Sequence, residues 1–399
     1  MRLTISLFGG LLALGWTAVA ADYAIGATQA RSLDTEPPFD TDARAAPALS
    51  VIVAACNEEE KLPAAFRTLL AQEYPGPLEI IAIDDRSTDR TPEILDALAR
   101  EAPREIRVVV LHLTRLPDGW LGKTHALYQG AGRATGEYLL FTDADIRFAP
   151  DTLSRALHYA HRENLDHLAS FFRLDLRGFW ENAFGLCFSL LFSLRFRPWR
   201  VRDSRTSNYL GIGGFNLVRR TAYHEIGTHR AIAIEVADDM ELGRRVKVAG
   251  LRSDVIGSAH HVVVRWQEGL TGLMGGLVKN AYAGLDYSPS VLFRSTGLLL
   301  VAVVWPFAAL ASFRNRPARV GNAVSVTTIL GIAAYHARAA VIFPAYALTL
   351  PLTTLLLIGV MFRSAWVTER NRGITWRGTF YPLDELRQRA VPPVPPAQG

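Results

Sequence analysis

The chain begins and ends in long apolar runs, and a segment of shorter apolar runs lies between them. Residues 3–21 contain no charged side chain, and further runs follow at 295–313, 320–335 and 339–362. About 20 apolar residues suffice for a helix to span the hydrocarbon core of a bilayer. The pattern therefore predicts an N-terminal membrane anchor at 1–24 and two or three transmembrane helices within 291–363.

The N-terminal run has a second interpretation, because Ala18, Val19 and Ala20 resemble the cleavage site of a secretory signal. We favour the anchor, since the apolar region is longer than a typical signal core. Residues 25–47 are polar and rich in Ala, Pro and Asp, which is typical of a linker.

Shorter apolar runs in the middle of the chain predict strands that alternate with helices. Strands are expected at 49–55, 78–83, 107–111 and 137–142, and helices at 60–72, from Thr91-Pro92 onward, and at 124–134. A hydroxyl followed by Pro is a helix start signal, with Thr91 as the cap. The alternation predicts a doubly wound α/β domain at 48–260, which would bind ligands beyond the carboxyl ends of its strands.

Two acids stand directly after the fourth predicted strand. Asp143 and Asp145 are separated by one residue on the expected turn. Carboxylate oxygens are preferred ligands of Mg²⁺ and Mn²⁺, which complete their coordination shells with substrate phosphates. Such a metal neutralises a leaving diphosphate. By themselves, two acids in a loop are more often solvated charge, so the neighbouring motifs decide the interpretation.

Four further motifs lie in a characteristic order around this pair. They are Ala54-Ala-Cys-Asn57-Glu58-Glu59, Asp84-Asp85-Arg-Ser-Thr-Asp89, Gly211-Ile-Gly213-Gly214-Phe215-Asn216 and Asp238-Asp239-Met-Glu-Leu242. Together they resemble the family 2 glycosyltransferases of the GT-A fold, over residues 49–280. The resemblance implies a nucleotide-sugar donor and a single displacement that inverts the anomeric carbon, with no covalent nucleophile.

The resemblance also implies roles in donor binding. Ala55, Asn57 and Glu58 would line the nucleotide pocket, and one of Asp84 and Asp85 would accept a hydrogen bond from the base or ribose. Asp143 and Asp145 would hold the metal. Lys123 would contact the diphosphate, unless it is an ordinary surface lysine at a helix start. Gly213 and Gly214 would let backbone approach the sugar or acceptor, although a simple turn uses the same residues.

Asp239 is the candidate general base, because a positioned carboxylate can take the proton of an attacking hydroxyl. It matches the acid of the family's E-D-x-x-L pattern, with Asp238 in place of the usual Glu. Asp238 would raise the pKa of the base. Both acids also stand where a helix begins, so capping is a compatible second role.

The segment 261–290 concerns the acceptor and is predicted to lie at the membrane interface. Arg265-Trp266 matches the end of the Q-x-x-R-W motif of processive polysaccharide synthases, but Val262 replaces the Gln. Lys279-Asn280 and the stretch 375–383, within the tail 364–399, are more similar to membrane-bound hopanoid- and carotenoid-pathway lipid glycosyltransferases. Arg265 and Trp266 would flank the diphosphate and acceptor, unless Trp266 is only a membrane-interface aromatic.

Two other segments carry weaker signals. Residues 179–199 end in arginines and fit either an interfacial helix or a buried core helix. His260 and His261 are adjacent, and neighbouring side chains of a strand point to opposite faces, which argues against a shared metal.

Composition narrows the class further. Apolar residues make up 49% and charged residues only 20%, which favours a mixed membrane and α/β architecture. The net charge of +5 comes without a basic stripe interleaved with aromatics, so nucleic-acid binding is not expected. Cys56 and Cys187 form neither a disulfide framework nor a zinc motif and fit a reduced compartment.

The sequence therefore predicts a metal-dependent inverting hexosyltransferase that moves a sugar, expected from a UDP-sugar, to a lipid acceptor. We expect a multi-pass protein of the cell membrane with its catalytic domain facing the cytoplasm. A processive polysaccharide synthase and a non-catalytic membrane scaffold are the alternatives. Loop 314–319 and the tail are both basic, and three alternating spans cannot place both in the cytoplasm.

Overall fold

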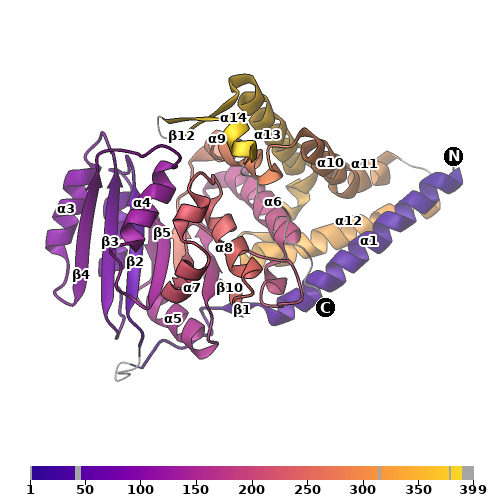
Figure 1. The fold of residues 1–399 in the computed structure, drawn as a ribbon. Helices are drawn as coiled ribbons and strands as arrows, with labels where there is room; N and C mark the ends of the chain where they lie inside the picture. The colour runs from indigo at the N-terminus through magenta and orange to yellow at the C-terminus, as the bar shows by residue number, and fades with distance from the viewer. Residues whose placement is uncertain (1, 41–45, 313–315, 377–378, 389–399) are drawn as a thin grey trace. The chain divides into compact units, whose positions relative to one another are not determined.

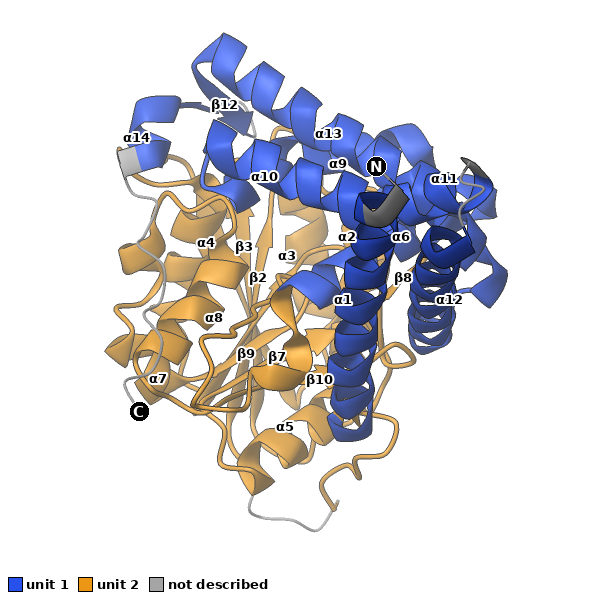
Figure 2. Cartoon of the chain, turned by 90° about the vertical axis from the view of Figure 1, so that its right-hand side faces the viewer, with its two compact units in different colours: residues 1–29, 176–195, 267–390 blue, residues 30–175, 196–266, 391–399 orange. Residues whose placement is uncertain are grey.

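The structure is a computed structural model that describes residues 2–40, 46–312, 316–376 and 379–388 (Figure 1). The chain folds into two compact units (Figure 2). We call Ala30–Asp175 with Phe196–Trp266 the sheet unit, and Met1–Gln29, Leu176–Arg195 and Gln267–Ala390 the helical unit. Arg377 and Gly378 of the expected C-terminal motif lie outside the described residues, as does the Pro-rich end.

The sheet unit is built on an eight-stranded mixed sheet in the order β1-β10-β7-β9-β5-β2-β3-β4. Its strands are β1 Arg31–Ser32, β2 Leu49–Ala55, β3 Leu78–Asp85, β4 Ile106–Leu113, β5 Tyr138–Asp143, β7 His167–Phe171, β9 Asn216–Arg219 and β10 Ser253–Gly257. Strand β9 is antiparallel to its neighbours β5 and β7, and the other pairs are parallel. A small second sheet joins β6 Ile146–Phe148, β11 Val262–Val264 and β8 Arg173–Leu174.

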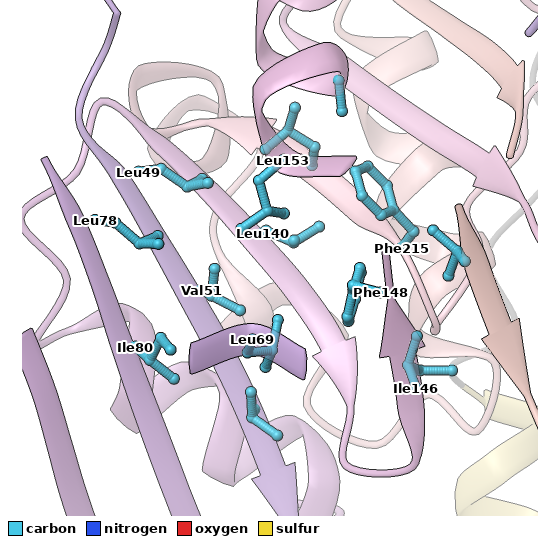
Figure 3. Packing of buried hydrophobic residues seen from close by; sticks show 14 of the residues in the cluster. Leu49, Val51, Leu69, Leu78, Ile80, Leu140, Ile146, Phe148, Leu153 and Phe215 are labelled. Carbon is cyan, nitrogen blue, oxygen red and sulfur yellow. The ribbon is translucent and has the colours of Figure 1, made fainter. Parts of the chain in front are cut away.

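Helices cover both faces of the large sheet. They are α2 Leu62–Leu70, α3 Thr91–Glu101, α4 Gly122–Ala131, α5 Thr152–Arg162, α7 Arg220–Glu225 and α8 Asp238–Val248, with short 3₁₀ turns at Pro198–Arg200 and His229–Ile232. Alternate residues of each strand enter separate cores because side chains point to opposite faces. Val51 and Ile80 join the core formed with α2, α3 and α5, shown in Figure 3, whereas Ile52 and Ile81 pack with α4, α7 and α8.

Several local details differ from the sequence expectation. Thr91 does not cap its helix: it is the first helical residue, its hydroxyl accepts a hydrogen bond from the Glu58 N–H (2.8 Å), and the Asp89 carboxylate accepts from the Thr91 N–H (2.9 Å). The segment expected as a linker is partly ordered secondary structure. Its first residues continue α1 to Gln29, and the next form β1, which pairs with β10 at the edge of the sheet.

The two adjacent histidines also differ from expectation. His260 and His261 lie in the turn between β10 and β11, not on a strand. Both reach the carboxylate of Asp34, at 2.8 and 3.2 Å, so the opposite-face argument was wrong for this pair. Among the residues the structure describes, no group of three or more His, Cys, Asp or Glu side chains is arranged to hold a metal ion by itself.

Among its described residues, the helical unit contains four helices that are long and apolar enough to cross a membrane. These are Thr4–Gln29, Pro289–Ala311, Arg316–Ala339 and Pro344–Asn371. Its elements are α1 Arg2–Gln29, α6 Gly178–Phe196, α9 Gly269–Ala281, a 3₁₀ turn Ala283–Leu285, α10 Pro289–Leu299, a π-helical turn Leu300–Val304, α11 Trp305–Ser312, α12 Arg316–Ala339, a 3₁₀ turn Pro344–Thr349, α13 Leu350–Asn371, β12 Gly373–Trp376, β13 Thr379–Pro382 and α14 Leu383–Gln388.

The apolar segment 179–199 forms most of α6, in which Cys187 and Leu190 are buried whereas Phe179 and Trp180 near its start are exposed. Cys187 and Leu190 share a core cluster with Trp16 of α1 and Ile329 of α12. The structure therefore favours the core-helix alternative for this segment over a helix lying free in the membrane interface.

Candidate active site

Three parallel strands bring the acidic motifs to one edge of the sheet. In the register, Ala55 of β2 pairs with Asp84 of β3, and Ala54 pairs with Asp143 of β5. Because the carboxyl ends of neighbouring parallel strands share an edge, motifs that lie far apart in sequence meet there. Asp143 is the last residue of β5, and Asp145 lies in the turn that precedes β6.

Lys123, in the first turn of α4, lies at the centre of this edge. Its Nζ is 2.9 Å from Asp143 Oδ1 and 3.5 Å from Asp238 Oδ1. Burial by itself lowers the pKa of Lys123, but the charges of Asp143, Asp238 and Asp239 outweigh it and raise the pKa. Lys123 is therefore a largely buried cation that pairs with the acids, and the surface-lysine alternative is wrong.

Asp239 is held in a fixed orientation at the start of α8. Its Oδ2 accepts a hydrogen bond from the Gly213 N–H (2.7 Å) and its Oδ1 from the Met240 N–H (2.8 Å). The backbone oxygen of Asp239 lies so close to Gly211 that a Cβ there would stand 1.7 Å away. A side chain at position 211 would displace Asp239, which explains the need for glycine.

Gly213 marks the point where the acids converge. A Cβ at this position would lie 3.1 Å from Asp143 Oδ2, 3.3 Å from Lys123 Nζ and 3.4 Å from Asp239 Oδ2. Asp143, Lys123 and Asp239 thus converge on Gly213, where no side chain separates them. Gly214 differs, since its missing side chain makes room for the ring of Phe172, 2.3 Å from an ideal Cβ. The absence of a side chain at Gly214 therefore allows the ring of Phe172 to pack closely against the backbone.

Burial raises the pKa of both acids at the start of α8, Asp238 and Asp239. It raises the pKa of Asp238 to about 6, with Lys123 opposing the shift and Asp239 and Asp143 adding to it. Burial is also the largest cause of the raised pKa of Asp239, again opposed by Lys123 and supported by the charge of Asp143. Burial, more than the neighbouring Asp238, therefore tunes the candidate base.

Asp145 contacts a lysine that the sequence analysis did not single out. Lys61 Nζ is 3.5 Å from Asp145 Oδ2 and donates hydrogen bonds to the backbone oxygens of Arg265 (3.0 Å) and Trp266 (3.2 Å). Burial and the charge of Asp143 raise the pKa of Asp145, while Lys61 opposes the shift. A lysine just before a helix carries no sequence signal for this contact, because its partner lies some 80 positions away.

The two acids at the end of β3 face opposite sides of the sheet. Asp84 points toward α3, where it accepts from the Ser87 N–H (3.0 Å) and contacts His112 Nδ1 (3.2 Å). Asp85 is fully buried on the side of α4, pairs with Arg86 (2.8 Å), and would stand 2.2 Å from a Cβ at Gly122. Asp85 therefore lies on the same face of the sheet as Lys123, and Asp84 does not.

Asn57 and Glu58 brace the loop that follows β3. The Asn57 side-chain oxygen accepts from the Thr88 N–H (2.7 Å), and Asn57 has a left-handed backbone with φ of 55°. The Glu58 N–H donates to Thr91. In this structure the backbone and amide of these residues shape the loop, and Ala55 is fully buried beneath it.

Arg265 and Trp266 follow β11 and are anchored in the sheet unit. Arg265 Nη1 donates to the backbone oxygen of Asp175 (2.5 Å). Trp266 packs against the core cluster that includes Val264 and Ile146. Trp266 is therefore partly buried in the sheet unit, whereas an aromatic side chain that only faced the membrane would not be.

Residues 50–227 match the family model described as glycosyl transferase family 2. The chain carries a family 2 glycosyltransferase domain. The 4,4'-diaponeurosporenoate glycosyltransferase of Staphylococcus aureus strain USA300 is 22% identical over 350 residues, which cover 85% of this chain and 89% of the relative. The same enzyme of strain MRSA252 aligns with equal identity and coverage.

A solved structure is similar to this chain in fold. The mannosyltransferase PcManGT of Pyrobaculum calidifontis, solved in complex with GDP-Man and Mn²⁺, superposes with a TM-score of 0.55 at 18% identity. The match covers 92% of this chain and 99% of that chain. At this identity the likeness establishes the GT-A fold and does not transfer a ligand.

Proposed function

We propose that this glycosyltransferase moves a sugar from a nucleotide sugar, with a UDP-sugar as the first candidate, to a membrane lipid with inversion at the anomeric carbon. One observation carries the proposal: Asp143, Lys123 and Asp239 border the same small volume beside Gly213. This arrangement puts a candidate metal ligand, a fixed cation and a candidate base within reach of one reacting centre.

The donor set at the end of β5 fits Mg²⁺ or Mn²⁺. Two carboxylates, Asp143 and Asp145, influence each other's charge and are each balanced by one lysine. Mg²⁺-type sites commonly use one or two carboxylates and leave the other positions to water and substrate phosphates. When bound, the cation would neutralise the leaving nucleoside diphosphate. Asp85, on the face of Lys123, is our candidate for the hydrogen bond to the base or ribose.

Asp239 is positioned to act as the general base. The N–H groups of Gly213 and Met240 hold its two oxygens, so its orientation does not depend on a ligand. A raised pKa brings a carboxylate closer to the operating pH, where proton transfer is most efficient. Asp238 and Lys123 form an ion pair beside it.

A lipid acceptor is supported by the helical unit and by the relative. The carotenoid-acid glycosyltransferase of S. aureus aligns over most of this chain. Lys279 of α9 lies 4.9 Å from the ring centroid of Trp376, so two parts of the expected lipid-enzyme motif meet in this unit. We infer an acceptor that is an amphipathic lipid with a hydroxyl or carboxyl group.

The product of the reaction tests the proposal against a processive synthase. Membranes that contain the full chain, supplied with a panel of labelled nucleotide sugars and a lipid extract, should yield an organic-soluble product that carries one sugar. Transfer of one residue involves no sugar channel and no repeated elongation. Polymeric label would favour the polysaccharide synthase, and the absence of any transfer with all donors would favour the scaffold.

Contacts within the helical unit support a specific membrane topology. Tyr282, at the end of α9, donates to Glu369 at the end of α13 (2.6 Å), and Arg387 of α14 donates to the backbone oxygen of Tyr287 (3.1 Å). Groups in direct contact lie on one side of a membrane. These contacts support an even number of membrane crossings between Tyr287 and Glu369.

The direction of α12 supports a choice of which helices cross. Gly9 of α1 lies against Ala318, and Tyr23 contacts His336 (3.0 Å), so α1 and α12 run parallel. We propose that α1, Pro289–Ala311 and α12 cross, while Pro344–Asn371 begins and ends on one side. Lys279, Arg370 and Arg387 gather on that side, which the positive-inside rule assigns to the cytoplasm.

Reporter fusions test this topology. A fluorescent protein fused after the tail should be fluorescent in a bacterial host, whereas alkaline phosphatase there should be inactive. The same pair inserted in the loop between α11 and α12 should show the opposite behaviour and serves as the matched control. Active phosphatase at the tail would mean that all three C-terminal helices cross, and the proposed topology would be wrong.

A further inference from the structure

We propose that Lys61 is a positioning residue that couples cation binding at Asp145 to the Arg265–Trp266 segment. Lys61 stands directly before α2, and its ammonium group bridges three groups from two distant parts of the chain. It lies 3.5 Å from Asp145 Oδ2, 3.0 Å from the backbone oxygen of Arg265 and 3.2 Å from that of Trp266. This inference rests on the proposed cation site at Asp143 and Asp145.

The chemistry of an ammonium group suits this bridging role. Lysine carries three N–H donors on a compact charge, which match two carbonyl oxygens and one carboxylate. The Asp145 side chain is 16% exposed and that of Lys61 37%, so water screens the pair only in part. Arg265 and Trp266 have further anchors at Asp175 and in the core, and Lys61 adds a link from this segment to the acid.

A divalent cation bound to Asp145 would weaken the ion pair between Asp145 and Lys61. The cation and the ammonium group compete for the same carboxylate, and their like charges repel each other. Lys61 therefore opposes cation binding in the absence of donor. A donor phosphate in the site would supply the negative charge that lets both cations remain. Binding of the donor would in this way change the hydrogen bonds that Lys61 donates to the backbone oxygens of Arg265 and Trp266.

The test compares cation affinity in full-length protein in detergent. Free Mn²⁺ is counted by electron paramagnetic resonance during titration with Mn²⁺, without nucleotide and with UDP or GDP. Lys61→Met should bind Mn²⁺ about three- to tenfold more tightly without nucleotide, because a nearby positive charge is gone. Lys61→Arg keeps the charge and should bind Mn²⁺ like the wild type.

Lys247 offers a matched control in the sheet unit. Its Nζ also donates to two backbone oxygens, those of Val201 and Asp203, both at 2.7 Å. Lys247→Met should leave Mn²⁺ affinity unchanged. Hydrogen exchange of the peptide that contains Arg265 and Trp266 should become faster in Lys61→Met and stay unchanged in Lys247→Met. The kcat of Lys61→Met should fall more than the KM for the donor rises.

The outcomes separate this inference from the proposed function. A wild type that binds no Mn²⁺ under any of these conditions would contradict the cation site itself. Normal Mn²⁺ binding in the wild type with unchanged or weaker binding in Lys61→Met would overturn the role of Lys61. Tighter binding without faster exchange at Arg265 and Trp266 would overturn the coupling.

Discussion

Asp143→Asn should reduce kcat/KM for sugar transfer by about three orders of magnitude. The substitution keeps the size of the side chain but removes the charge that a cation and the donor diphosphate require. Lys123, 2.9 Å away, also loses its nearest counter-charge. Transfer of label from the nucleotide sugar, measured over a range of donor concentrations, gives the ratio.

A second acid provides the control for Asp143. Asp151 precedes α5, lies 2.5 Å from Arg155, and belongs to no group around Gly213. Asp151→Asn should keep wild-type kcat/KM. Mn²⁺ binding should be weakened in Asp143→Asn and unchanged in Asp151→Asn. Full turnover by Asp143→Asn in the presence of a metal chelator would remove the basis of the metal-dependent mechanism.

Asp239→Asn should lower kcat by about 10²- to 10⁴-fold with a hydroxyl acceptor, while the KM for the donor changes little. An amide keeps the hydrogen bond from Gly213 but cannot take a proton. Burial raises the pKa of Asp239, and the base works in its ionised form. The wild type should therefore lose kcat/KM as the pH falls through this raised pKa, at a higher pH than an ordinary aspartate near about 3.9 would give.

The pH profile distinguishes a base from a merely structural acid. In Asp239→Asn the acid limb of kcat/KM that belongs to Asp239 should disappear, whereas a structural role predicts a uniform fall at every pH. The acceptor provides a further contrast. A carboxyl acceptor is already ionised at neutral pH, so the penalty for Asp239→Asn should be much smaller with a carotenoid acid than with a lipid alcohol. Equal penalties would argue against proton abstraction by Asp239.

Much of the sheet unit follows from local sequence. Strands β2 and β3 are buried along their whole length, and their continuous apolar runs predicted that directly. The register of parallel strands then places the residues after each run at one edge, so the meeting of Asp84, Asp85 and Asp143 was predictable from strand ends alone. Helix ends were less predictable: α4 begins before the expected start, at Gly122, which packs against Asp85.

The choice between equivalent residues required the tertiary structure. Sequence spacing left Asp84 and Asp85 equal, and the alternation of side chains across β3 separated them, since only Asp85 faces α4. The contact between Lys279 of α9 and the ring of Trp376 likewise joins two segments that only the tertiary structure brings together.

The amino-acid sequence by itself determined strands β2 to β5 with the helices between them, the acids at the sheet edge and the apolar helices, because these depend on periodicity and on neighbours along the chain. Strands β7, β9 and β10 became evident only in the structure. The tertiary structure alone decided that Lys123 lies between Asp143 and Asp238, that Gly211 must admit the backbone of Asp239, and that Lys61 joins Asp145 to Arg265. Each of these contacts joins residues from separate elements. Their distances are set by how the helices pack on the two faces of the sheet, which no local pattern encodes.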